Sequence, residues 1–402
     1  MAARQAPQPQ AAAAASASTF LDVDAQFGGN VAAAVAEAER SGGRSPVVWL
    51  GPEYAISKTI EITRPVSIRG GGKAGTRFRH AGSFTGPIFR TSQLKRNGQW
   101  ESTARSAPIT TFDPDVDDGG VEFRDFSIVD DDRSTPGRMG MYLMSVDDMW
   151  MSNVSFGYLT GTALKLGADE ADKRATSPRS GRVRESNFDR INVYRCGSGS
   201  PTGSPDVPAL IVQSAAGEGD GSNQLFFTNL RFVYNEGRML ISGRDDANSL
   251  RRLMFRDTQL HALADNASWS PTKFFPFDMV TLEGGVREVF FDGVFINGGK
   301  AGTAGWAMKG SSLTSQTPKR LVLRNVNVVN TAGDLVRVEK GDSVAVDGTS
   351  LGSVGGKIIR NQAGSGLARY YVHELGINSP SGKSSGLTGK GGFFHSGLQV
   401  DA

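Results

Sequence analysis

The chain has 402 residues, with 44 lysines and arginines against 41 aspartates and glutamates and a formal net charge of +3. This near balance argues against a nucleic-acid partner, because binding to phosphates needs a large positive excess. The single cysteine, Cys196, excludes an internal disulfide framework, and no apolar run approaches the ~18 residues of a membrane-spanning helix, so we expect no membrane insertion.

The N-terminal segment is rich in Ala, Gln and Pro. It lacks the charged and then apolar layout of a secretory signal peptide. Residues 1–18 are therefore predicted to be a flexible arm that orders when it binds a partner. Residues 19–27 are predicted to form a short strand or an extended lead-in.

A short amphipathic helix is predicted for residues 30–41, with Asn30 as its N-cap and Gly42 at its end. The segment 47–72 then alternates apolar runs with turns and ends in a Gly-Gly-Gly-Lys sequence. This sequence lacks the spacing of a phosphate-binding Walker loop, and no helical pattern follows it, so it predicts a tight turn.

Residues 91–119 form a polar insertion that contains Asp113, Asp115, Asp117 and Asp118. Their spacing is similar to that of a calcium-binding loop, but the glutamate that completes such a loop is missing. We therefore expect no metal here, and no cofactor elsewhere in the chain.

One eight-residue pattern repeats from residue 121 onwards. Its first, third, sixth and eighth positions are almost always apolar, and its fifth is Asp, Asn, Gly or, once, Arg. The copies are 121–128, 149–156, 186–193, 225–232, 253–260, 289–296, 321–328 and 344–351. They recur at intervals of roughly 23 to 39 residues, which is typical of a solenoid.

The alternation within each copy predicts two short strands that meet at the fifth residue. Asn, Asp and Gly favour this corner because they tolerate a left-handed backbone. A third strand follows most copies, at 163–166, 209–212, 239–241, 279–282 and 335–338. Equivalent strands of successive turns must pair in parallel, so we predict an all-β fold, a single-stranded parallel β-helix over residues 19–358. The Gly/Ser-rich residues 359–402 are predicted to be a tail, either loose or ordered against another subunit.

The start of the coil carries a family resemblance. A short helix precedes VVWLGPEYAISKTIEITRPVSIRGGG, in which residues 50–54 form a turn and the end is a Gly-rich bend. This arrangement resembles the opening of pectate-lyase-like right-handed parallel β-helix proteins, in which a helix caps the coil. The resemblance implies a right-handed coil with a short N-terminal capping helix. It leaves the chemistry open, because the superfamily includes polysaccharide lyases, hydrolases, epimerases and phage tailspikes.

Aromatic and polar residues recur just past the second half of the pattern on neighbouring turns. They are Asp130, Tyr158, Tyr194, Arg195, Tyr234, Asn235, Glu236 and His261. With turns ~4.8 Å apart, they would form a ribbon on the outside of the coil. Sugar rings stack on aromatic faces, and Arg or Asn binds their hydroxyl or uronate groups. We predict that the carbohydrate-binding residues are Tyr158, Tyr194, Arg195, Tyr234 and Asn235. The alternative is a ribbon that only covers the coil.

Catalytic residues are less well defined. Glycoside hydrolysis needs two carboxylates ~5–5.5 Å or ~6.5–9.5 Å apart, and Asp189 and Glu236 on adjacent turns are the candidate pair. Asp130 lies too many turns from Glu236 to join it. For β-elimination a base must remove the C5 proton, and the outward-facing His261 is a candidate. Each of these residues is alternatively an ordinary surface group.

An apolar stripe follows the outward second position of the pattern. It comprises Trp150, Phe226, Met254, Phe290 and Val322. A soluble monomer seldom leaves several hundred Å² of apolar surface bare. We predict that copies of the chain pack through this stripe, as a homotrimer or another ring. The alternative is that the chain's own C-terminal tail covers it.

These features predict a spike or fibre protein of a phage or phage-like particle that recognises a bacterial capsular or O-antigen polysaccharide. The N-terminal arm would bind an anchor protein of the particle, which places the chain on the virion surface. Whether it also depolymerises the polysaccharide stays open. The alternatives are a secreted polysaccharide lyase or glycoside hydrolase, and a structural fibre that binds no sugar.

Overall fold

The computed structural model describes most of the region from residue 20 to residue 396. The described ranges are 20–40, 47–91, 95–96, 99–100, 121–131, 133–144, 146–167, 183–198, 207–214, 222–243, 250–261, 278–299, 301–312, 314–329, 331–351, 356–362, 369–377 and 393–396. The predicted arm at 1–18 and the aspartates at 113–118 lie outside them.

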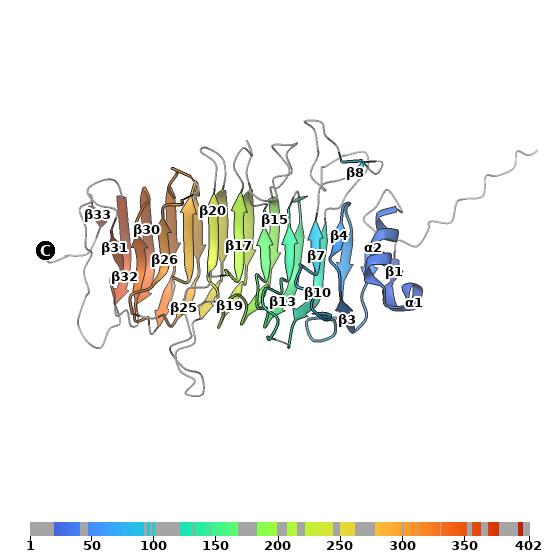
Figure 1. Cartoon of the computed structure of the whole chain (residues 1–402). Coiled ribbons are helices and arrows are strands. Elements are labelled where there is room, and N and C mark those ends of the chain that lie inside the picture. Colours follow the sequence, from blue (N-terminus) through green and yellow to red (C-terminus); the bar gives the residue numbers. More distant parts are fainter. Residues whose placement is uncertain are drawn as a thin grey trace, which may run out of the picture.

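Short strands stack turn upon turn along one long axis and form a parallel β-helix (Figure 1). Each regular turn contributes a strand to each of three faces. The first and second faces, which precede and follow the fifth residue of the repeat, belong to one sheet, and the third face is a separate sheet. The predicted all-β parallel β-helix is thus confirmed.

Strand bounds follow the repeat closely. The sheet of the first and second faces contains β1 (Phe20–Asp22), β2 (Val47–Trp49), β3 (Glu53–Ile56), β5 (Ser67–Arg69), β6 (Arg77–His80), β10 (Glu122–Val129), β12 (Val146–Asp147), β13 (Trp150–Gly157), β15 (Val183–Asp189), β16 (Asn192–Tyr194), β18 (Asn223–Thr228), β19 (Arg231–Val233), β21 (Arg251–Arg256), β22 (Gln259–His261), β24 (Val289–Asp292), β25 (Phe295–Asn297), β27 (Arg320–Arg324), β28 (Asn327–Val329), β30 (Ser343–Leu351), β32 (Arg369–Ile377) and β33 (Phe393–Ser396). The third face contains β4 (Ile60–Ile62), β7 (Phe89–Thr91), β11 (Met141–Leu143), β14 (Leu164–Leu166), β17 (Leu210–Ser214), β20 (Met239–Gly243), β23 (Val280–Gly284), β26 (Ala304–Lys309), β29 (Asp334–Val338) and β31 (Ile359–Asn361). A separate antiparallel pair joins β8 (Lys95–Arg96) and β9 (Gln99–Trp100).

Helix α2 (Val31–Arg40) lies at the N-terminal end of the coil, where Figure 1 shows it beside the first strands. The side chain of Asn30 accepts a hydrogen bond from the N–H of Ala33 at 3.1 Å, so the predicted N-cap is confirmed. The helix buries one face of small apolar residues against the coil. None of the described helices is long and apolar enough to cross a membrane.

The prediction of an extended segment for residues 19–27 is wrong after Asp22. A one-turn helix, α1 (Val23–Phe27), begins there, because the Asp22 side chain accepts a hydrogen bond from the N–H of Ala25 at 2.9 Å. Gly28 ends the helix with a φ of 58°. The helix is too short to show an amphipathic period, so only its caps could have revealed it.

A left-handed residue separates the first face from the second face on every regular turn. The fifth positions have φ values between 52° and 68°: Asp125, Asn153, Arg190, Asn229, Asp257, Gly293, Asn325 and Gly348. Side-chain amides also tie adjacent turns together, because Asn153 donates to Asp125 Oδ1 at 2.6 Å and Asn325 donates to Asp292 Oδ1 at 2.9 Å. The predicted role of the fifth position is confirmed, and its Asn side chains add contacts between turns.

The coil continues past residue 358, which corrects the predicted boundary of the tail. Strand β31 extends the third face, and β32 pairs with β30 in parallel from Ser343–Arg369 to Leu351–Ile377. Residues 370–377 therefore occupy the register of a further copy of the repeat. Its first, third, sixth and eighth positions are the apolar Tyr370, Val372, Leu375 and Ile377, so this copy follows the pattern, and only Glu374 at the fifth position departs from the usual Asn, Asp or Gly.

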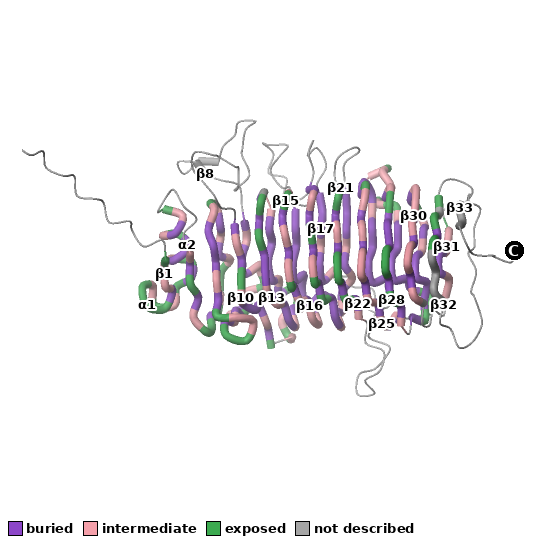
Figure 2. Tube along the Cα trace, turned by 180° about the vertical axis from the view of Figure 1, so that it is seen from behind, coloured by how far each residue is buried: buried purple, intermediate pink, exposed green. Residues whose placement is uncertain are grey.

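Stacked aromatic rings form the centre of the core. The rings of Phe188, Phe227, Phe255 and Phe291 are parallel within 10°, and their centroids are 4.4, 4.7 and 4.5 Å apart along the series. They occupy the third position of the repeat, so the register of the backbone places them directly over one another. Buried residues recur in the same way along the whole coil (Figure 2).

Replacing Phe255 by alanine removes one ring from the middle of this stack. We expect the free energy of unfolding to fall by about 3–5 kcal/mol, because the coil cannot collapse around the cavity without losing its register. The control is Phe20→Ala, where the ring is 44% exposed, with an expected loss below about 1 kcal/mol. Denaturant titration measures the free energy of unfolding of both variants. Equal losses in the two would contradict the assignment of Phe255 to the core.

Candidate functional site

A row of aromatic rings runs along the outside of the coil beyond the second face. We call Tyr158, Tyr194, Arg195, Tyr234 and His261 the tyrosine ridge. Ring centroids are 5.4 Å apart from Tyr158 to Tyr194, 5.8 Å to Tyr234 and 6.3 Å to His261, each pair edge to face. All five side chains are half-buried, so the ridge combines packing with an open side.

The ridge is built from two adjacent positions rather than one. Tyr194 and His261 share a position in the register with Val233, whereas Tyr158, Arg195 and Tyr234 each follow that position. The sequence analysis placed the aromatic residues just past the repeat without separating these two positions. The structure instead interleaves the two positions, and this produces the edge-to-face contacts.

Tyr158, Arg195 and Tyr234 form a second left-handed corner, with φ values of 58°, 52° and 56°. A bulky residue in this conformation costs roughly 1–2 kcal/mol. Gly298, at the equivalent place two turns beyond Tyr234, has a φ of 89° without that cost. Strained residues of this kind concentrate at functional sites, so the corner marks the ridge as a candidate site.

Arg195 lies between two rings of the ridge. Its guanidinium carbon is 5.5 Å from the centroid of Tyr158 and 5.3 Å from that of Tyr194, which are cation–π distances. Burial, followed by a hydrogen bond to Tyr158, raises the pKa of Tyr194. At physiological pH Tyr194 is therefore a neutral phenol, and Arg195 places one positive charge beside it.

Asn235 does not bind a ligand, which corrects its predicted role. Its side chain is fully buried, Nδ2 donates to the Val193 carbonyl at 3.0 Å, and Oδ1 accepts from the N–H of Cys196 at 2.9 Å. The left-handed corner at Tyr234 redirects the chain, so the strand alternation no longer predicts the direction of the next side chain. Burial also raises the pKa of the Cys196 thiol to about 12, so this thiol is unreactive.

Asp130 is also buried and does not belong to the outer ribbon. Its Oδ1 is 2.7 Å from a guanidinium nitrogen of Arg138, and its Oδ2 is 3.0 Å from Nδ1 of His80. On the other side of the His80 ring, Nε2 faces the carbonyls of Gly86 and Met139 at 3.0 and 3.1 Å. This buried cluster joins two turns and has a structural role.

The candidate carboxylates Asp189 and Glu236 lie at different corners. Asp189 is at the first corner, where its carboxylate accepts from Asn229 at 3.0 Å and pairs with Arg190 at 2.9 Å. Glu236 lies beyond the second corner and pairs with Arg133 at 2.7 Å. The structure does not bring the two carboxylates together, and a different arginine holds each of them.

His261 closes the C-terminal end of the ridge. Its ring lies 6.3 Å from Tyr234 and 5.2 Å from Phe295 between centroids. Burial, helped by the positive charge of Arg231, lowers its pKa, so the imidazole is neutral at physiological pH. A neutral imidazole can accept a proton, but the ridge places no carboxylate beside it to orient the ring.

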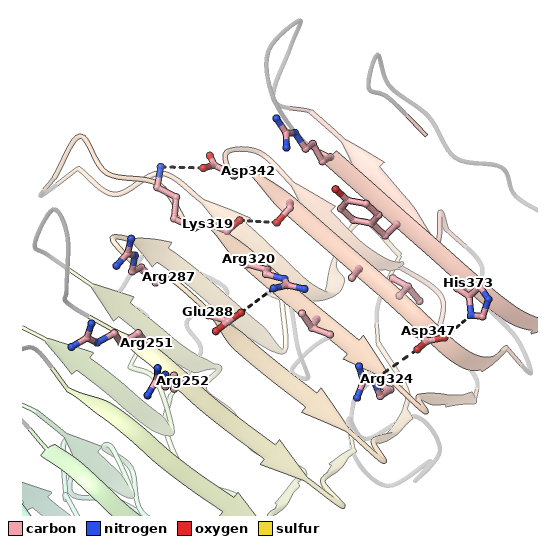
Figure 3. A pocket seen from close by; sticks show the side chains of 16 residues that line it. Arg251, Arg252, Arg287, Glu288, Lys319, Arg320, Arg324, Asp342, Asp347 and His373 are labelled. Atoms are coloured by element: carbon pink, nitrogen blue, oxygen red, sulfur yellow. Dashed lines mark hydrogen bonds and ion pairs between the residues drawn. The ribbon is translucent and has the colours of Figure 1, made fainter. Parts of the chain in front are cut away.

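A second candidate surface is a groove on the first face, in the C-terminal half of the coil (Figure 3). We call it the basic groove; its volume is about 1180 Å³. The cations that line it are Arg251, Arg252, Arg287, Lys319, Arg320, Arg324 and Arg369, and the carboxylates are Glu288, Asp342 and Asp347. Seven permanent positive charges against three negative charges make its wall strongly basic.

Every carboxylate of the groove has a cationic partner. Glu288 pairs with Arg320 at 3.1 Å, Asp342 pairs with Lys319 at 3.2 Å, and Asp347 lies 3.8 Å from Arg324 and 3.0 Å from His373 (Figure 3). Sequence reasoning missed the groove because its basic residues precede the repeat or occupy its fourth position. Aligning the charged residues before each copy would have shown the cluster.

The predicted apolar stripe lies on one line of the first face. The register aligns Trp150, Phe226, Met254, Phe290 and Val322. Trp150 is 48% exposed and Phe226 is 37% exposed, but Val322 is 5% exposed and lines the groove. Within the described ranges no cluster of three or more His, Cys, Asp or Glu side chains is suited to a metal.

Comparison with known proteins identifies the fold. No family model matches the sequence, and no curated protein matches it. Among solved structures, the chain is similar to ORF18 of Geobacillus virus E2, with 14% identity over 87% of this chain and 57% of that chain and a TM-score of 0.55. It is also similar to the A-module of the Azotobacter vinelandii mannuronan C-5 epimerase AlgE4, with 12% identity over 91% of this chain and 95% of that chain and a TM-score of 0.49.

A third similar structure is the enzymatically active domain of tailspike protein 2 of bacteriophage CBA120. The identity is 13% over 91% of this chain and 43% of that chain, with a TM-score of 0.40. The chain spans a little over half the length of the Geobacillus virus protein. At such identities the likeness concerns the fold alone, and this fold is the parallel β-helix that the pectate-lyase-like resemblance implied.

Replacing Asn235 by alanine tests its structural role. The change leaves the Cys196 N–H and the Val193 carbonyl buried without partners, so we expect a loss of about 1–3 kcal/mol in the free energy of unfolding. Asn327→Ala, at an exposed position of β28, is the control, with an expected change within about 0.5 kcal/mol. If Asn235→Ala left the free energy of unfolding unchanged, the two hydrogen bonds of this amide would not contribute to stability.

The buried His80 predicts that stability depends on pH. Burial lowers its pKa in the folded protein below the ordinary value of about 6.5 that it keeps when unfolded. The unfolded state therefore binds more protons, and stability is present above pH 6.5 and lost as the pH falls through the folded pKa. We expect His80→Gln to lose less stability than the native chain between pH 7 and pH 5 in urea titrations. Identical pH dependence of the two proteins would contradict this.

Proposed function

We propose that this chain is the polysaccharide-recognising part of a spike or fibre of a phage or phage-like particle. The observation that carries the proposal is the tyrosine ridge, in which Tyr158, Arg195 and Tyr234 keep bulky side chains in left-handed backbone on the outside of the coil. Glycine would remove this backbone cost, so these side chains are retained for their contacts. Rings arranged in a row along successive turns suit a linear chain of sugars.

The chemistry of the ridge matches that of a sugar polymer. The apolar faces of sugar rings pack against tyrosine, and the phenol hydroxyl groups exchange hydrogen bonds with sugar hydroxyls. Arg195, fixed between two rings, supplies a charged donor for hydroxyl or carboxylate groups. These groups are already in place on the ridge, so recognition of a bacterial capsular or O-antigen polysaccharide needs no movement of the coil.

Assembly follows from the apolar stripe and the N-terminal arm. Trp150 and Phe226, which are exposed on the first face, support packing of copies into a homotrimer. Residues 1–18 would bind an anchor protein of the particle, and the chain would then lie on the virion surface. Hydrolysis by Asp189 and Glu236 is not part of the proposal, because these carboxylates lie at different corners of the coil.

Replacing Arg195 by glycine tests the ridge without damaging the fold. Glycine fits the left-handed corner, so we expect the free energy of unfolding to change by less than about 1 kcal/mol. Affinity for the polysaccharide that a glycan array identifies should fall about tenfold or more, because a charged hydrogen bond is lost. Isothermal titration calorimetry measures the affinity.

The matched control is Arg190→Gly. Arg190 has the same left-handed conformation, with a φ of 53°, but lies at the first corner and pairs with Asp189. Its replacement should leave sugar binding unchanged. The proposal would be overturned if Arg195→Gly and Arg190→Gly lost equal affinity for the polysaccharide. It would also be overturned if the native protein bound no envelope polysaccharide.

A further inference from the structure

We infer that the basic groove is a second binding site, separate from the ridge, and that its ligand is an acidic glycan. The inference rests on the proposed function only in taking the polymer to be a sugar chain. The acidic character of the ligand is inferred from the charges of the groove. The groove carries a surplus of four positive charges, whereas the whole chain has a net charge of +3.

Three arginines of the groove are available for a ligand. Arg252, Arg287 and Arg369 are exposed, and the described part of the chain places no carboxylate at ion-pair distance from them. The groove's carboxylates are occupied by other cations, so they do not neutralise these three. In Figure 3, Arg252 and Arg287 lie at the rim, apart from the dashed ion pairs. Unpaired guanidinium groups on one wall bind carboxylate, sulfate or phosphate groups by paired hydrogen bonds.

The shape of the groove fits a polymer rather than a small ion. Strands β21, β27, β30 and β32 and the two residues just before β24 contribute to it, and five parallel strands extend over about 19 Å. Its floor follows one line of the register, Val322, Ala345 and Tyr371, and Tyr371 is 41% exposed. An apolar floor with an exposed ring suits the faces of sugar rings.

Charged rows flank this floor on both sides. In one row of the register Ser343 lies between Arg320 and Arg369, and in the other row Asp347 lies between Arg324 and His373. A sugar chain along the floor would therefore present its acidic substituents to positive charge on either side. A neutral chain would gain no ion pair from the unpaired Arg252, Arg287 and Arg369, so the groove favours a charged one.

A second copy of the chain is a poorer occupant. Copies related by a rotation axis along the coil would bring the same arginines face to face, and like charges repel. The exposed Trp150 and Phe226 lie outside the groove, toward the N-terminal end of the first face.

The test compares two triple variants of the full chain. The groove variant is Arg252→Gln, Arg287→Gln and Arg369→Gln. The control is Arg40→Gln, Arg64→Gln and Arg79→Gln, which removes the same charge at the N-terminal end of the coil. The probes are polyglucuronate, the neutral glucan obtained by reducing its carboxyl groups, and duplex DNA, each titrated at about 50 and about 200 mM salt.

We expect the native protein to bind polyglucuronate more tightly than the neutral glucan, with an affinity that falls as salt rises. The groove variant should lose about tenfold or more in affinity and show a weaker salt dependence, while the control variant should match the native protein. Equal binding of the acidic and neutral polymers, unchanged binding by the groove variant, or tighter binding of DNA would overturn the inference.

Arg195→Gly, titrated beside the groove variant, separates the two proposals. If only the groove variant loses polyglucuronate binding, the groove inference is supported. This holds even if Arg195→Gly leaves binding of the array polysaccharide unchanged, a result that would overturn only the ridge proposal. Loss of polyglucuronate binding only in Arg195→Gly assigns the acidic glycan to the ridge and overturns the groove.

Discussion

The left-handed residue at the corner between the first and second faces is the constraint on which the rest of the structure depends. It bends the chain at the same place on every regular turn, from Asp125 to Gly348. The strands on either side can then pair with their equivalents on the next turn without a shift in register. Because the register holds, a residue type repeated in the sequence becomes a line of side chains in space, with steps of ~4.8 Å. The stacked phenylalanines inside and the charged rows outside both follow from this.

The two corners of each turn use different residues for the same backbone conformation. The first corner takes mainly Asn, Asp and Gly, which adopt it at low cost, and its amides connect neighbouring turns. The second corner takes Tyr158, Arg195 and Tyr234 on the turns of the ridge. A third left-handed position, just before the repeat, takes Asp148, Glu185, Gln224 and Arg252. Among the three positions, only the second brings aromatic rings together in a row. The ridge and the basic groove lie on different faces, so one rigid coil can contact a polymer at two places.

The sequence predicted the fold because an eight-residue pattern with one corner residue is enough to specify a coil of stacked strands. It also predicted the Asn30 cap and the position of the tyrosines. It failed where side-chain direction depends on more than alternation. Asn235 turns inward because a left-handed tyrosine precedes it, and Asp130 is buried between Arg138 and His80, the latter 50 residues earlier in the chain. The groove depends on residues outside the repeat, which a search for apolar periodicity does not align.

The tyrosines of the ridge pack against one another on the outside of the coil. The half-buried tyrosines of the ridge hold one another in place, so a ligand meets rings that are already ordered. Preorganisation of this kind reduces the entropy lost on binding.

The most direct test of polysaccharide recognition is a crystal structure of the protein with an oligosaccharide of the polysaccharide that it binds. We expect sugar rings that lie along the coil axis and contact Tyr194 and Tyr234. Sugar bound only at the ends of the coil, with the ridge empty, would contradict a coil that recognises polysaccharide along its side.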